Sequence, residues 1–189
     1  MIRIFLKWLP FAVVTTGMCL LIYGAEQQNF RLSLNDPQIQ MAEDGAALLA
    51  GGALTTAIVP RTPLVDADAS LAPFIAVFDS EGLPLESSGT VNGAPPKPPV
   101  GVFAAAQNDS GKGTTQPYEN RVSWQPSGGT RIALVVKYVP GTKQFVAAGR
   151  NMREVEAREA HLHSQMLLAW IVTLFVSFGT VAFASRRTV

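Results

Sequence analysis

The chain has 189 residues, of which 48% are hydrophobic and only 15% are charged, and its mean hydropathy is +0.21. A soluble domain usually has about 25% charged residues, so this composition argues against an ordinary soluble protein. The length excludes a second large domain, the net charge of +1 argues against a nucleic-acid partner, and the single cysteine excludes an intramolecular disulfide and a cysteine-rich metal site.

Two segments of the chain, residues 8–25 and 160–185, contain no Asp, Glu, Lys or Arg. Each is long enough for a membrane span, which needs about 20 mostly apolar residues. We therefore predict two transmembrane helices, over residues 8–24 and 165–184. The lipid bilayer is the first partner that the sequence implies.

A cleaved signal peptide is the alternative for the first segment, because Arg3 and Lys7 precede an apolar centre. However, Tyr23 puts a large ring where a cleavage site has a small residue. A lipoprotein signal needs a small residue before Cys19, where Met18 stands. We therefore expect an uncleaved anchor.

The distribution of charge predicts the orientation of the two spans. The segment between them has 11 of the 15 basic and all 14 acidic residues, a net charge of −3 (11 − 14), whereas two basic residues lie on each outer side. The positive-inside tendency places residues 1–7 and 185–189 in the cytoplasm. Residues 25–164 then form one domain beyond the plasma (inner) membrane, in the periplasm or outside the cell.

The domain is predicted to begin with a helix. Asp36 is a suitable N-cap and Pro37 fits the first helical position. Apolar residues follow at helical spacing until Gly51 and Gly52 end the helix. A connector with several prolines then leads to Pro73.

A β-hairpin and a short helix are predicted next. Residues 74–78 are strong strand formers, residues 79–82 form a turn, and residues 83–88 return as the second strand. After a proline-rich loop we expect a short helix over residues 100–107. An exposed polar loop is predicted over residues 108–116.

Three more strands are expected over residues 119–125, 130–139 and 144–148, because turn signals separate these stretches. Val135 interrupts the alternation of the middle strand, which predicts burial on both faces near its centre. Residues 152–183 are then predicted to form one helix that runs from the domain into the membrane.

The segments that best characterise this order of elements are residues 74–82, 84–89, 121–125, 131–136 and 149–154. The order resembles the extracytoplasmic sensor region of bacterial two-pass receptors, such as membrane sensor histidine kinases. The resemblance implies an α+β, Cache-like or PAS-like domain with a central antiparallel sheet of about five strands and a long membrane-proximal helix. Such receptors carry an output domain after the second span, where this sequence has only a short tail, so the resemblance implies signal transduction through a partner.

The predicted helix that leads into the second span has two interpretations. Apolar residues at three- or four-residue spacing, with Glu159 as the polar exception, either pack under the sheet or form a dimer seam. Farther along, Ser177 and Gly179 permit close packing of helices in a membrane. They favour self-association or pairing with the first span, without distinguishing the two.

A search for catalytic and metal-binding residues predicts none, and no cofactor. His161 and His163 lie two apart on a predicted helix, so they do not converge on one metal. Residues 111–115 resemble a phosphate-binding loop but lack the Ser or Thr that must follow its lysine. Asp66 and Asp68 are expected to be solvated loop charges.

The candidate ligand-binding residues are a basic and aromatic set on the later strands: Arg121, Trp124, Arg131 and Lys137. An arginine on the concave side of a small sheet can bind a carboxylate or phosphate through two hydrogen bonds. The alternative is that Trp124 belongs to the core and the charged residues are exposed strand positions.

Two functions therefore remain open. The first is a sensor-like or ligand-binding module without catalytic output, which acts through a membrane protein partner or as a homodimer and takes a small-molecule ligand. The second is a structural or assembly subunit of a membrane complex, whose domain binds protein. A pocket ringed by Arg121, Arg131 or Lys137 favours the first, and a filled apolar sheet favours the second.

Overall fold

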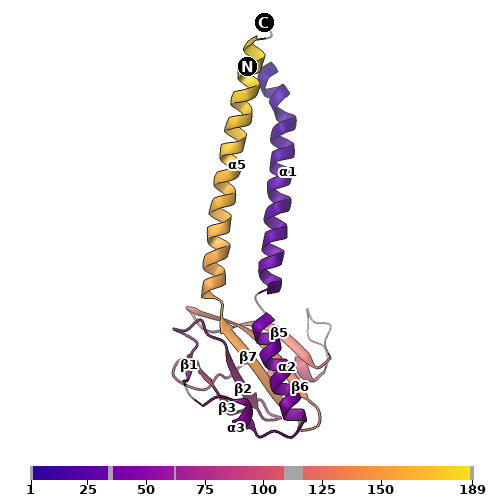
Figure 1. Cartoon of the computed structure of the whole chain (residues 1–189), viewed down its shortest axis with the longest axis vertical. Coiled ribbons are helices and arrows are strands. Elements are labelled where there is room, and N and C mark those ends of the chain that lie inside the picture. Colours follow the sequence, from indigo (N-terminus) through magenta and orange to yellow (C-terminus); the bar gives the residue numbers. More distant parts are fainter. Residues whose placement is uncertain (1, 34–35, 62, 109–116, 188–189) are drawn as a thin grey trace. The chain divides into compact units, whose positions relative to one another are not determined.

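The computed structural model describes residues 2–33, 36–61, 63–108 and 117–187 (Figure 1). The chain divides into two units, a helical unit (Met1–Ser33 with Val155–Val189) and a sheet domain (Leu34–Glu154). The phosphate-loop-like segment and residues 109–116 of the predicted polar loop lie outside the described residues.

The sheet domain combines helices with one main antiparallel sheet. Its elements are α2 (Asp36–Ala50), α3 (Thr55–Ile58), β1 (Val65–Asp66), β2 (Phe74–Phe78), β3 (Pro84–Ser87), β4 (Gly89–Thr90), α4 (Val100–Gln107), β5 (Glu119–Ser127), β6 (Thr130–Val139) and β7 (Gln144–Asn151). The order of the five-stranded sheet is β3-β2-β7-β6-β5, and β1 pairs with β4 in parallel. The predicted α+β class and the antiparallel sheet of about five strands are confirmed, whereas α3, β1 and β4 lie where no element was predicted.

Both faces of the five-stranded sheet are packed. Alternate residues of β2 point to opposite faces, and all five are buried. On one face, Phe74 and Phe78 belong to a core cluster that includes Phe103 of α4. On the opposite face, Ile75 and Val77 belong to a second cluster that includes Leu49 of α2. The strand β6 is buried on both faces near its centre, as the interrupted alternation predicted.

The helical unit contains α1 (Ile2–Ser33) and most of α5 (Arg153–Arg187). Trp8 Nε1 donates a hydrogen bond to Ser177 Oγ (2.9 Å), and Trp170 Nε1 donates one to Thr16 Oγ1 (3.0 Å). The later residue of α1, Thr16, contacts the earlier residue of α5, Trp170, so the two helices are antiparallel. The contact of Ser177 with Trp8 therefore supports pairing of α1 with α5 within one chain.

Many apolar side chains of these two helices are exposed. The exposed side chains include Phe11 and Leu21 of α1, and Leu168 and Phe175 of α5. Among the described residues, both helices are long and apolar enough to cross a membrane, and the most apolar part of each has none of its residues buried. They are compatible with membrane spans, and α5 is continuous from the end of the sheet domain, as predicted.

Close packing of α2 on the sheet depends on Gly45. A Cβ atom at this position would lie 2.8 Å from Ile75 Cδ1 and 2.9 Å from Val146 Cγ1, closer than side chains normally approach. We expect Gly45→Val to lower the free energy of unfolding by about 1–3 kcal/mol, the usual cost of overpacking. Chemical denaturation of the full chain in detergent, followed by circular dichroism, measures this change.

Gly101→Val is the matched control, because a Cβ at Gly101 meets no atom within 4 Å. Equal stability of the Gly45 and Gly101 variants would contradict the close approach of α2 to the sheet.

Candidate functional site

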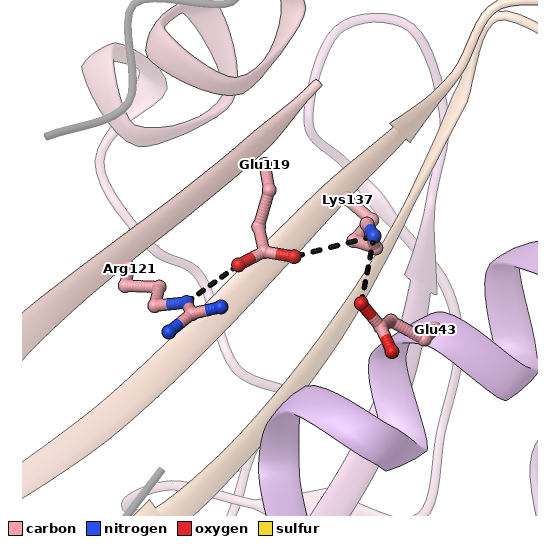
Figure 2. A network of polar contacts seen from close by, with 4 residues as sticks. All are labelled: Glu43, Glu119, Arg121 and Lys137. Carbon is pink, nitrogen blue, oxygen red and sulfur yellow. Dashed lines mark hydrogen bonds and ion pairs between the residues drawn. The ribbon is translucent and has the colours of Figure 1, made fainter. Parts of the chain in front are cut away.

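A buried carboxylate lies at the start of β5 (Figure 2). The Glu119 side chain has 0% exposure, and its Oε1 lies 2.5 Å from Arg121 Nε, which donates a hydrogen bond to it. Its Oε2 lies 3.2 Å from Lys137 Nζ. Lys137 Nζ also donates to Glu43 Oε1 of α2 at 3.3 Å. We call these four residues the ion-pair network.

The register of the sheet explains why these side chains meet. Glu119 and Lys137 are direct partners across β5 and β6, and Arg121, two residues along β5, shares the face of Glu119. Two cations and two anions balance, which offsets the several kcal/mol that desolvating each buried ion costs. The network therefore joins β5, β6 and α2 and holds both cationic side chains against carboxylates of the chain itself.

The structure brings together two of the four candidate ligand-binding residues. Arg121 and Lys137 share Glu119 as a partner, whereas Trp124 packs against the Phe-rich cluster on the opposite face of the sheet. Arg131 is exposed on β6. The sequence search missed Glu119 and Glu43, because only the strand register and the position of α2 bring these carboxylates to the lysine.

A second set of contacts fixes the start of α5 to the connector between β1 and β2. Arg150 Nε donates to Leu71 O (2.8 Å), Asn151 Nδ2 to Ala67 O (2.7 Å) and Arg153 Nη2 to Ala69 O (3.1 Å). We call these six residues the α5 clasp. Its donors come from the end of β7 and the first residue of α5, and its acceptors are alternate carbonyls of one loop.

Further bonds reinforce the junction between β7 and α5. Asn151 Oδ1 accepts a hydrogen bond from the backbone N–H of Arg153 (2.7 Å), as an N-cap side chain does. Arg150 Nη2 donates to Glu154 Oε2 at 2.6 Å. The junction is therefore held by side chains on both sides of the point where the strand becomes a helix.

Asp68, in the clasp loop, has structural partners and is more than the solvated charge that the sequence predicted. Its Oδ1 accepts a hydrogen bond from Thr130 Oγ1 (2.6 Å), and its Oδ2 accepts one from the backbone N–H of Asn92 (2.6 Å). The Thr130 hydroxyl, and secondly the Asn92 amide, hold the pKa of Asp68 below its ordinary value of 3.8, although burial opposes them. The carboxylate thus connects the loop to the start of β6.

The two histidines, His161 and His163, lie on α5. Within the helical unit the ring of His163 contacts that of Tyr23, with centroids 5.7 Å apart. Over the part of the chain that the structure describes, no group of three or more His, Cys, Asp or Glu side chains is placed to hold a metal ion.

Comparison with known proteins does not assign a family. The chain matches no protein-family model, and searches of curated proteins and of solved structures give no significant match. The similarity to Cache-like or PAS-like sensor regions therefore remains a prediction from the order of elements.

Removal of the buried negative charge should destabilise the sheet domain. Glu119→Gln keeps the shape of the side chain but leaves Arg121 and Lys137 with Glu43 as the remaining carboxylate of the network. Breaking a buried ion pair costs about 3–5 kcal/mol, so we expect a large drop in the free energy of unfolding. Glu81→Gln, in an exposed turn, is the control. Equal denaturation midpoints for the two variants would show that the network contributes nothing.

The lowered pKa of Asp68 predicts a dependence of stability on pH. A carboxyl group whose pKa is lower in the folded state stabilises it above the unfolded pKa of about 3.9, and this contribution disappears as the pH falls through the folded pKa. We therefore expect Asp68→Asn to destabilise the chain at pH 7, and the difference from wild type to shrink below about pH 4.

Denaturation curves recorded from neutral to acidic pH measure this difference. Asp44→Asn, at an exposed position of α2, is the matched control. A difference between wild type and Asp68→Asn that is independent of pH would rule out the carboxylate as its cause.

Proposed function

We propose that the chain is a two-span plasma-membrane protein whose sheet domain lies outside the cytoplasm and acts by binding a partner protein. The exposed apolar surfaces of α1 and α5 support membrane insertion. The basic residues on the outer sides of both spans support cytoplasmic termini. The same charge pattern supports a position of the sheet domain in the periplasm or outside the cell.

The observation that carries the choice of a protein partner is the ion-pair network. Arg121 and Lys137 are the cations that a small anionic ligand would need, and they are held by Glu119 and Glu43. A ligand would have to displace a buried carboxylate and leave it without a counter-charge. Together with a sheet packed on both faces, this favours a domain that offers its surface to protein, as in a subunit of a membrane complex.

The α5 clasp favours a second candidate, a sensor region that signals through a membrane partner. Three side chains connect one loop of the domain to the end of β7 and to the first residue of α5, a helix that continues to Arg187. A ligand or partner that displaces this loop would move the start of α5. In this candidate the domain is Cache-like or PAS-like, and its antiparallel sheet and long helix agree with that resemblance.

The orientation can be tested with single cysteines in a Cys19→Ser background. We expect a membrane-impermeant maleimide to label Gly128→Cys, in the exposed turn between β5 and β6, in intact cells or spheroplasts. Thr188→Cys should be labelled only after the membrane is permeabilised. Labelling of Thr188→Cys from outside would overturn the proposed topology.

The partner can be identified by site-specific photo-crosslinking in the native membrane, with mass spectrometry. A benzophenone residue at the exposed domain positions Leu54 and Leu64 should give a covalent adduct with a membrane-complex subunit, whereas one at buried Val146 should give none. Adducts with a kinase or receptor would support the sensor candidate. Absence of any heterologous adduct at the exposed positions would contradict both candidates.

A thermal-shift screen separates the two candidates by ligand. Small acids, phosphates and amines are tested on the full chain, and any hit is repeated on Arg131→Gln, because Arg131 is exposed and lies outside the ion-pair network. Stabilisation that is weaker in Arg131→Gln supports the sensor. No stabilisation across the panel supports the protein-binding subunit.

A further inference from the structure

A groove lies between α1 and α5 within the helical unit. Its lining residues are Lys7 and Phe11 of α1 and Val181, Ala184 and Ser185 of α5. Because the helices are antiparallel, Lys7 and Ser185 lie toward the ends of the chain, and Phe11 and Val181 lie toward the middle of the spans. The groove is therefore polar at its outer end and apolar at its inner end.

The charged side chains toward both ends of the sequence are all basic. Arg3 and Lys7 precede the first span, Arg186 and Arg187 follow the second, and no acidic residue occurs before Glu26 or after Glu159. Clusters of Lys and Arg beside transmembrane helices attract anionic lipids, and basic pockets between such helices bind lipid head groups. The charge at this end of the groove is therefore complementary to a lipid phosphate.

The seam between the helices explains why the groove is open. Trp8 directly follows Lys7 and precedes Phe11 by about one turn. Its ring packs against α5, where Nε1 donates a hydrogen bond to Ser177 Oγ and the ring centroid lies 5.4 Å from that of Phe178. Beyond this contact the small side chains of Ala184 and Ser185 cannot fill the same space. Phe11 keeps 58% exposure, so its ring is available to an acyl chain.

We propose that this groove binds one anionic phospholipid of the cytoplasmic leaflet. The Lys7 ammonium group donates to the lipid phosphate, and the acyl chain lies along Phe11 and Val181. The proposal rests on the proposed membrane insertion and orientation. It adds a lipid preference that neither span requires for insertion.

The experiment uses the full chain reconstituted into mixed vesicles of phosphatidylcholine and phosphatidylglycerol. After mild detergent extraction, native mass spectrometry counts the lipids that remain bound. We expect one phosphatidylglycerol to be retained in preference to phosphatidylcholine. The variant Lys7→Gln removes one positive charge near the membrane surface. We expect it to retain phosphatidylglycerol about fivefold more weakly than wild type.

Two pairs of variants separate the groove from general effects of charge and bulk. Lys97→Gln removes the same charge from an exposed domain loop and should retain the lipid. Ala184→Trp fills the groove and should abolish retention, whereas Val172→Trp, on the exposed surface of the same helix, should not. Equal retention by wild type, Lys7→Gln and Ala184→Trp would overturn the lipid site.

Membrane insertion is measured separately, by flotation of the vesicles and resistance to alkaline extraction. A chain that inserts but shows no preference for phosphatidylglycerol overturns the lipid site alone. A chain that does not insert overturns the proposed function, and the lipid site with it.

Discussion

The pairing of β5 with β6 depends on the ion pairs of the buried Glu119 carboxylate. A fully desolvated charge is tolerated only where counter-charges surround it, and here Arg121 and Lys137 lie on either side. Lys137 also binds Glu43, so a single lysine connects β6 to both β5 and α2. A slip of one residue between β5 and β6 would turn these side chains to opposite faces and leave the carboxylate unpaired. The network therefore fixes strand register and helix position together.

The α5 clasp gives the central strand of the sheet a second role. The strand β7 lies between β2 and β6, and it ends at Asn151. The Asn151 side chain accepts a hydrogen bond from the backbone N–H of Arg153 and donates one to the carbonyl of Ala67. Only Met152 separates the end of β7 from the first residue of α5. This junction makes the domain suitable for transmitting a displacement, whereas the filled faces of the sheet make it suitable for binding protein. The two proposed functions differ in which of these properties is used.

Much of the fold was predictable because its signals are local. The strand-forming residues at 74–78 and the turn at Asp79–Gly82 act over a few neighbours, as does the helical spacing of apolar residues after Pro37, and each produced the expected element. The strands β1 and β4 were missed because each has two residues and exists only by pairing with the other. The role of Asp68 was missed for a similar reason, since Thr130 Oγ1, its hydrogen-bond donor, is 62 residues away along the chain.

The sequence by itself determined the two long apolar helices, the charge asymmetry across them and the α+β class of the domain between them. These follow from composition and from periodicity, which need no knowledge of what lies opposite each residue. Only the tertiary structure decided which partners the polar side chains bind. Arg121 and Lys137 are candidate ligand-binding residues in the sequence, and the structure brings Glu119 between them. Ser177 favours self-association or pairing with α1 equally in the sequence, and the structure adds a hydrogen bond from Trp8 of the same chain. A partner that lies far away along the chain is set by register and helix packing, and the local sequence carries no signal for it.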